Sequence, residues 1–99
     1  MKKALTIVAL AAAIGIAPAH ADTVKIGYLT TLSGSNGIIG KQMQNAVELA
    51  LEHKGGKLGG MDAEVIFADD QRKPDVAKQL ANRLIKSDRV DVVAGVIWS

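Results

Sequence analysis

The residues best suited to chemistry lie in a loop of glycine, serine and asparagine between positions 30 and 40. Its glycines follow the spacing G-x-x-G-x-x-G, whereas the dinucleotide-binding motif requires G-x-G-x-x-G. A phosphate-binding loop would need a glycine in place of Ser35 and a hydroxyl residue in place of Gln42. The spacing therefore argues against a nucleotide site.

The same loop is suited to a weaker anion. We expect a helix to follow it, and the free N–H groups at a helix start, together with the Ser33 hydroxyl, can bind a carboxylate. In a simpler interpretation the glycines only turn the chain and Ser33 caps the helix. The two roles are compatible, and the first makes Ser33 a candidate ligand-binding residue.

Two further groups of residues could contribute to a site. Asp69 and Asp70 could ligate a metal or act as an acid–base pair, but adjacent residues at a strand end point in opposite directions. We therefore expect one aspartate in a hydrogen-bonded turn and the other in solvent. Trp98 either closes the domain surface or forms one wall of a ligand cleft, and the sequence leaves both interpretations open.

The composition excludes several kinds of active site. The 99 residues contain no cysteine, and His53 is the one histidine after position 21. Neither a thiolate metal site nor a histidine triad can be built from this stretch, and no nucleophile–base pair is recognisable. We expect no bound metal and no cofactor.

The elements that must position these residues alternate along the chain. Apolar runs predict strands, and apolar residues at helical spacing predict two helices between them. Strands joined by helices form a parallel sheet, and ligands of such sheets bind beyond the carboxyl ends of the strands. We expect the opening half of a doubly wound α/β domain. Strands are expected over residues 24–29, 63–68 and 90–97, and helices over residues 41–53 and from Pro74 up to residues 87–89.

Residues 1–21 have the layout of a secretory signal peptide. A basic head precedes an apolar run over residues 4–16, Pro18 breaks the helix, and Ala19 and Ala21 are the small residues that a signal peptidase recognises. A membrane anchor is the alternative, but it needs about 20 apolar residues. We expect export and cleavage after Ala21.

The net charge of the chain indicates which kinds of partner it can bind. The chain has twelve Lys and Arg against ten Asp and Glu, and two of the basic residues, Lys2 and Lys3, belong to the signal segment. The remaining charges balance and no basic stripe is visible, so we expect no nucleic-acid partner.

Residues 22–99 are too few for two lobes, and three strands with two helices leave apolar surface without a partner. We expect them to form the N-terminal part of an incomplete lobe, with the second lobe and the hinge absent. A natural small domain ending at Ser99 is the alternative.

After the export signal, the chain resembles the start of a type I periplasmic solute-binding protein of ABC importers, in the leucine/isoleucine/valine-binding family. The resemblance rests on the first strand with its Ser-Gly loop, the first helix with its paired glycines, the aspartates followed by proline, and the third strand. These features lie in residues 24–34, 46–60, 69–74 and 92–99.

The resemblance implies a two-lobe clamp that closes on a small ligand and presents it to a membrane permease in the periplasm. By position, Ser99 matches the family's carboxylate-binding serine, and Ile39 matches a cleft position that is often aromatic. Ser33 and Gly34 match the rim of the first loop. The resemblance implies a binding protein, not an enzyme, whose ligand is a branched-chain amino acid or a related small carboxylate. We expect the protein to be a monomer.

Two departures from the family bear on the ligand. Some members have a disulfide between positions that match Arg72 and Trp98 here, so both cysteines are missing together. Ile39 replaces an aromatic residue, and Trp98 adds one nearby. An aromatic or aliphatic carboxylate is therefore a further possibility. Two other classes also fit the pattern, namely an exported enzyme on a doubly wound fold and the ligand-sensing domain of a receptor.

Overall fold

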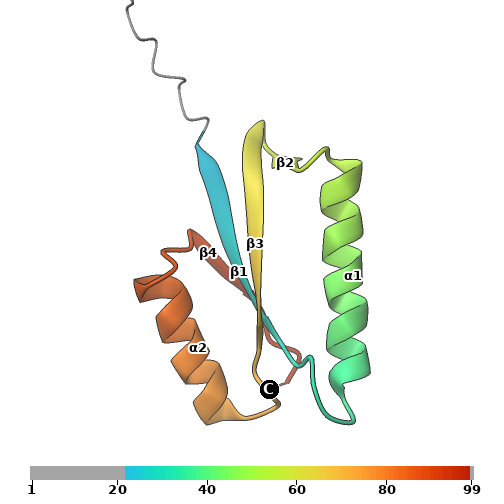
Figure 1. Cartoon of the computed structure of the whole chain (residues 1–99), viewed down its shortest axis with the longest axis vertical. Helices are drawn as coiled ribbons and strands as arrows, with labels where there is room; N and C mark the ends of the chain where they lie inside the picture. Colours follow the sequence, from blue (N-terminus) through green and yellow to red (C-terminus); the bar gives the residue numbers. More distant parts are fainter. Residues whose placement is uncertain (1–21, 99) are drawn as a thin grey trace, which may run out of the picture.

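The computed structural model describes residues 22–98. The predicted signal peptide, its cleavage after Ala21, and Ser99 lie outside the described residues. Two helices cover opposite faces of a small sheet, and the three long strands run in the same direction (Figure 1). The elements are β1 (Thr23–Thr30), α1 (Gly37–His53), β2 (Lys57–Leu58), β3 (Met61–Asp69), α2 (Pro74–Lys86) and β4 (Val92–Gly95).

The sheet has the order β2-β3-β1-β4, and β1 pairs in parallel with both β3 and β4. This confirms the parallel α/β architecture expected from the alternation of strands and helices. The register pairs Thr30 with Asp69 and Leu29 with Gly95. The carboxyl ends of all three strands therefore lie side by side at one end of the sheet, which we call the carboxyl edge.

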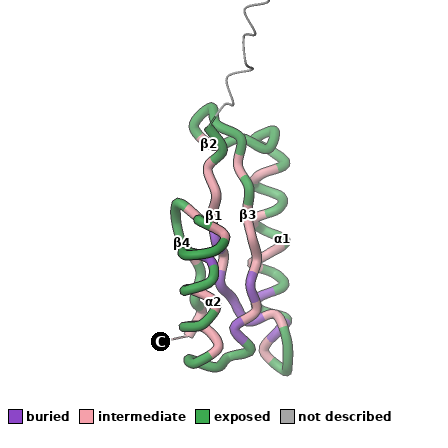
Figure 2. The backbone as a smooth tube through the Cα atoms, turned by 60° about the vertical axis from the view of Figure 1, so that its left-hand side comes forward, coloured by how far each residue is buried: buried purple, intermediate pink, exposed green. Residues whose placement is uncertain are grey.

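The core lies on the α2 face of the sheet. Leu84 of α2 is completely buried and packs with Leu29 and Ala68. It lies directly over Gly27, where an added Cβ would come within 3.0 Å of the Leu84 side chain. The buried residues gather towards the carboxyl ends of β1 and β3 and the start of α1 (Figure 2). The best-packed part of the molecule is thus the part that supports the strand-end loops.

Helix α1 begins at Gly37, four residues before the predicted start. The predicted loop over residues 30–40 is therefore too long at its end, because residues 37–40 belong to the helix. Gly37 and Gly40 are both buried, and they pack against the backbone of Leu32 and Thr31. Because neither glycine has a Cβ, the first turn of the helix can lie directly against the preceding segment.

The glycine pair at 59 and 60 forms a hairpin that the sequence analysis did not predict. Both residues have positive φ, 57° and 82°, as a type I′ turn requires. The turn pairs Leu58 with Met61 and extends β3 two residues towards its amino end. The short antiparallel strand β2 is the result.

Strand β4 is shorter than predicted, with four residues in place of residues 90–97. The backbone leaves the sheet at Gly95 and Val96, whose φ angles are 106° and 70°. Left-handed residues cannot continue a pleated strand, so the pairing ends there.

Other helix signals are confirmed. Pro74 is the first residue of α2. Helix α1 ends at His53, and Gly55 and Gly56 beyond it have left-handed conformations. The Gly56 N–H donates to the Leu51 carbonyl at 2.8 Å, which is the bond of a Schellman cap.

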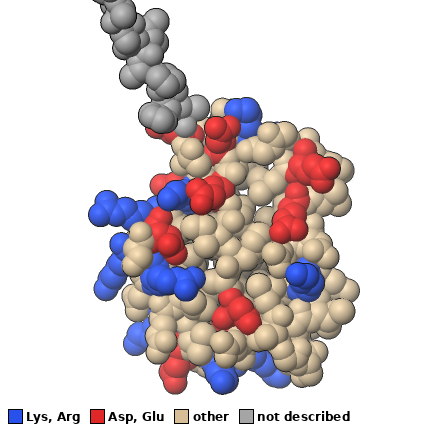
Figure 3. Space-filling view, viewed as in Figure 1, with Lys and Arg blue, Asp and Glu red and all other residues tan. Residues whose placement is uncertain are grey.

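Acidic and basic side chains are mixed on the face shown in Figure 3, with several Lys and Arg on the side of α2. Within residues 22–98, no helix has the length and apolarity needed to cross a bilayer.

Replacing Gly40 with alanine should destabilise the protein, because the new Cβ would overlap the Thr31 carbonyl oxygen. Alanine favours a helix interior over glycine by about 1 kcal/mol, but overpacking against backbone typically costs about 1–3 kcal/mol or more. Gly55→Ala is the matched control, since its Cβ would meet nothing within 4 Å. It should cost only the left-handed penalty, about 1–2 kcal/mol. Urea denaturation measures the free energy of unfolding of both variants. A Gly40→Ala protein as stable as the wild type, or more stable, would contradict the packing.

Candidate functional site

The ends of β1, β3 and β4 are joined by backbone hydrogen bonds just before the chain enters the loops. The Asp70 N–H donates to the Thr30 carbonyl at 2.9 Å, and the Val96 N–H donates to the Leu29 carbonyl at 2.7 Å. Three loops therefore leave the same edge of the sheet from fixed positions. This is the edge at which parallel sheets bind ligands.

A chain of side-chain hydrogen bonds links the three loops. The Trp98 Nε1–H donates to Thr31 Oγ1 at 3.0 Å, and the Thr31 hydroxyl donates to Asp70 Oδ1 at 2.5 Å. The same carboxylate oxygen accepts the Arg72 backbone N–H at 2.8 Å. Thr31 and Asp70 are 1% and 4% exposed. Hydrogen bonds to a buried carboxylate are among the stronger ones in proteins, so this series of hydrogen bonds holds the three loops firmly together.

Asp69 holds the first loop from the other side. Its Oδ1 accepts the backbone N–H groups of Leu32 at 2.8 Å and Gln71 at 2.9 Å. Burial raises the pKa of Asp69, but hydrogen bonds from Leu32, Ser33 and Gln71 outweigh it and bring the pKa below its ordinary value of 3.8.

The prediction of one aspartate in a hydrogen-bonded turn and one in solvent holds only in part, because the half-buried Asp69 is hydrogen-bonded as well. Asp69 and Asp70 both accept several hydrogen bonds, each from a different set of partners. Each carboxylate has one partner in the segment after β1 and one in the turn after β3, because β1 pairs with β3 up to its last residue.

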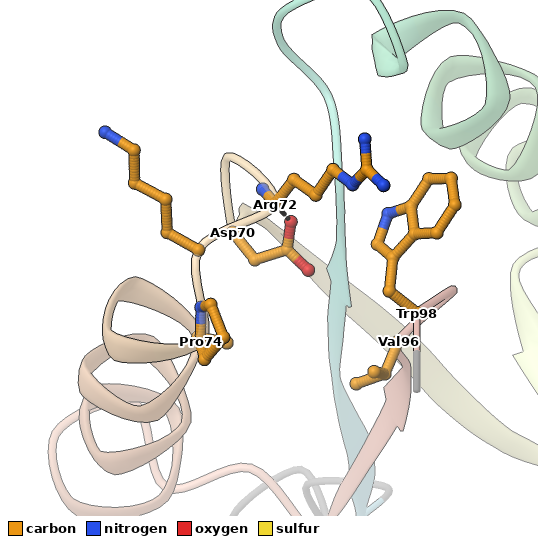
Figure 4. Close-up of a pocket in the computed structure, with 7 residues that line it drawn as sticks. Asp70, Arg72, Pro74, Val96 and Trp98 are labelled. Carbon is orange, nitrogen blue, oxygen red and sulfur yellow. Dashed lines mark hydrogen bonds between the residues drawn. The ribbon is translucent and has the colours of Figure 1, made fainter.

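A cavity of about 360 Å³ opens beside this hydrogen-bonded chain (Figure 4). Apolar groups form much of its lining, and two cationic side chains reach it from the loop after β3. The Arg72 guanidinium carbon lies 4.5 Å from the centre of the Trp98 ring. The cavity is lined by Asp70, Arg72, Lys73, Pro74, Ala77, Val96 and Trp98.

The backbone around the cavity is strained. Gln71 and Arg72 are consecutive non-glycine residues with positive φ, 54° and 58°, and the β-branched Val96 has a φ of 70°. Such conformations each cost of order 1–3 kcal/mol and are characteristic of functional sites. The Asp69 and Asp70 carboxylates hold the first pair in place through the backbone N–H groups of Gln71 and Arg72.

The predicted site residues occupy different parts of this edge. Trp98 lines the cavity, and Ser33 lies beside Asp69, where its hydroxyl and N–H help to lower the pKa of that carboxyl. Gly34 is exposed, with a φ of 74°. Ile39 is 38% exposed in the first turn of α1. Ser99 lies outside the described residues.

Ser33 does not cap α1, contrary to one of its two predicted roles. The residue before the helix is Asn36, and no side chain caps the helix start. The Gly37 and Ile39 N–H groups donate instead to the carbonyls of Gly34 and Asn36, at 3.1 and 3.2 Å. These backbone bonds leave the helix start fewer free donors for an anion than we expected.

Thr31 and Arg72 are the site residues that sequence reasoning missed. Thr31 carried no signal of its own, because a threonine after a strand is common. Arg72 was noted only as a position where some family members have half of a disulfide. Here a cation–π contact joins Arg72 and Trp98 in place of that bond. Within the part of the chain that the structure describes, no three acidic or histidine side chains converge on a metal position.

Comparison with known proteins shows which family the chain belongs to. A family profile described as periplasmic binding protein matches residues 23–99, nearly the whole of the segment that follows the predicted signal. The chain belongs to the periplasmic binding protein family. The binding components of ABC transporters that form this family are not enzymes.

Curated relatives of this periplasmic binding protein include the Leu/Ile/Val-binding protein homolog 6 of Brucella abortus (strain 2308), 32% identical over 101 residues. The alignment covers 100% of this chain and 26% of the relative. Homolog 3 of Brucella melitensis is 33% identical over 97 residues, covering 96% of this chain and 26% of that protein. The chain thus spans about a quarter of the length of the curated relatives it matches.

Solved structures agree with this assignment. A solute-binding protein of an ABC transporter from Rhodopseudomonas palustris BisB5, in complex with 3,4-dihydroxybenzoic acid, is 40% identical with a TM-score of 0.70. The match covers 74% of this chain and 20% of that one. LivJ from Streptococcus pneumoniae, in complex with isoleucine, is 27% identical with a TM-score of 0.68, over 76% and 22% of the two chains. The type I periplasmic-binding-protein fold expected from the resemblance is confirmed.

The two buried threonines at the end of β1 allow a matched test of the hydrogen-bonded chain. Thr31→Val removes the hydroxyl that joins Asp70 and Trp98, and should destabilise the protein by about 1–3 kcal/mol. Thr30→Val is the control, because the Thr30 hydroxyl is equally buried but has no hydrogen-bond partner within residues 22–98. It should be neutral or stabilising. Chemical denaturation compares the two, and a larger loss for Thr30→Val would contradict the network.

Protonation of Asp69 at low pH should remove the stability that its hydrogen bonds to the first loop contribute. A carboxylate whose pKa is lowered on folding stabilises the protein above its unfolded pKa, about 3.9, and that contribution disappears as pH falls through the folded pKa. Asp69→Asn should therefore be less stable than the wild type at pH 7, and the gap should narrow below about pH 4. Asp22→Asn, at an exposed position, controls for the lost charge. A gap that stays constant from pH 7 to about pH 2 would rule out this role.

Proposed function

We propose that this chain belongs to the extracytoplasmic substrate-binding subunit of an ABC importer, which captures a small carboxylate for delivery to a membrane permease. The observation that carries the proposal is the position of the site. In a member of the periplasmic binding protein family, three loops are locked together at the carboxyl edge of a parallel sheet, beside an apolar cavity. Such an edge binds ligands and needs no catalytic group.

The ligand class follows from the chemistry shared by the relatives' ligands. The Rhodopseudomonas palustris BisB5 protein was crystallised with 3,4-dihydroxybenzoic acid, and another protein from R. palustris, 33% identical to this chain, with benzoate. LivJ was crystallised with isoleucine. Each of these ligands joins a carboxylate to an apolar body. We propose the same class here, a branched-chain amino acid or a related aliphatic or aromatic carboxylate.

Five residues are proposed as ligand contacts in the first lobe. The resemblance assigns the carboxylate to Ser99 and the cleft wall to Ile39. Trp98, which lines the cavity, adds an aromatic surface, and Ser33 with Gly34 forms the rim. Any group that pairs with a ligand ammonium would come from a second lobe.

The proposal includes the whole protein's organisation. Residues 1–21 would direct export to the periplasm and be removed after Ala21, and residues 22–99 would form part of the first lobe of a monomer. The exposed valines of the edge strand β4, Val92 and Val93, suit a sheet that continues beyond it.

The test is a calorimetric titration of the full-length mature protein with isoleucine, 4-hydroxybenzoate and 3,4-dihydroxybenzoate. At least one acid should bind, and its uncharged amide should bind much more weakly, because the carboxylate is the recognised group. Ser99→Ala should weaken binding by roughly 10- to 100-fold, the effect of losing a hydrogen bond to a charged group. Ser87→Ala, at the far end of α2, is the matched control and should bind as the wild type does.

Two results would count against the proposal. Equal binding of the acid and its amide would reject a carboxylate site. No binding of any aliphatic or aromatic acid by the folded protein would reject the ligand class.

A further inference from the structure

Trp98 is held by its side chain rather than by its backbone. Within residues 22–98, the last backbone hydrogen bond of this segment runs from the Val96 N–H to the Leu29 carbonyl. Beyond that point the recorded anchors are the indole N–H, which donates to Thr31, and the indole face, which meets Arg72. The position of the segment that leads into residue 99 therefore depends on how the indole ring is held.

The two anchors constrain different motions. A single hydrogen bond at Nε1 fixes one point of the ring edge and lets the ring swing about that point. The Arg72 guanidinium, 4.5 Å from the ring centre, restrains the ring plane. Together they define both the place and the tilt of the indole. Figure 4 shows the second anchor, with the Arg72 side chain beside the Trp98 ring.

Arg72 is itself built into a strained and well-supported position. Its backbone is left-handed, with a φ of 58°, and its N–H donates to the buried Asp70 carboxylate. No salt bridge among residues 22–98 involves Arg72, so the indole is the partner that the structure shows for its charge. Strained residues persist where the surroundings hold them, and they concentrate at functional sites.

We propose that Arg72 is a positioning residue for the ligand site. It acts through Trp98, whose ring it holds from one face. By covering one face of the indole it fixes the ring as a wall of the site and leaves the other face and the edge for the ligand's apolar body. The inference rests on the proposed function, because it assigns Arg72 a part in setting affinity for the acid.

The planar guanidinium matters for this role. It stacks on an aromatic face as a flat group, whereas a lysine ammonium is a compact, strongly hydrated charge. Arg72→Lys should therefore restore only part of what Arg72→Met loses, which separates ring positioning from a simple effect of net charge.

The experiment uses the full-length mature protein with Arg72→Met, Arg72→Lys and, as control, Arg89→Met. Arg89 is also an exposed arginine with a left-handed backbone, φ 55°, and it does not line the cavity. Two quantities are measured on each variant. The first is the fluorescence anisotropy of Trp98, obtained by subtracting the signal of Trp98→Phe. The second is the dissociation constant for isoleucine and for 3,4-dihydroxybenzoate, measured by calorimetry.

Arg72→Met should lower the anisotropy of Trp98 and weaken binding of the preferred acid by roughly three- to tenfold. Arg72→Lys should fall between Arg72→Met and the wild type, and Arg89→Met should match the wild type. A merely structural role for Arg72 would lower the melting temperature without changing the anisotropy of the folded protein.

Three results would overturn the proposal. Unchanged anisotropy in Arg72→Met would show that Arg72 does not position the ring. Lower anisotropy with an unchanged dissociation constant would show that the ring does not act on the ligand, and equal weakening by Arg89→Met would reduce the effect to net charge. Failure of the proposed function is recognised separately, because the wild-type protein would then bind neither acid before any substitution is made.

Discussion

The hydrogen bond from the Thr31 hydroxyl to the Asp70 carboxylate joins the ends of two neighbouring parallel strands where solvent does not reach them. A buried carboxylate is costly unless donors surround it, and here the donors come from the loops themselves. Thr31 comes from the loop after β1, and Arg72 from the turn after β3. Asp70 therefore stays buried only while these loops keep their present arrangement.

The same hydrogen bond explains how the loop after β4 is held in place. Because the Thr31 oxygen donates to Asp70, its lone pairs remain available to accept the Trp98 indole N–H at 3.0 Å. One hydroxyl thus connects the ends of strands β1, β3 and β4 at the edge where parallel sheets bind ligands. The strained backbone at Arg72 and Val96 is stable in this setting because both residues are tied to β1 or to the carboxylate.

Arg72 and Trp98 stand at the two positions where, according to the resemblance, some family members have a disulfide. A disulfide is covalent and indifferent to salt, whereas a cation–π contact is weaker and depends on the orientation of the ring.

The amino-acid sequence by itself determined the order of strands and helices, the parallel sheet, the end of α1 at its glycine pair and the start of α2 at Pro74. These features follow from local periodicity and from backbone preferences, which neighbouring residues decide. Tertiary structure decided the early start of α1, where buried Gly37 and Gly40 meet backbone from another segment. It also decided the partners of both aspartates and the roles of Thr31 and Arg72. Those contacts join residues up to 67 positions apart, and only the register of the parallel strands brings them within reach of each other.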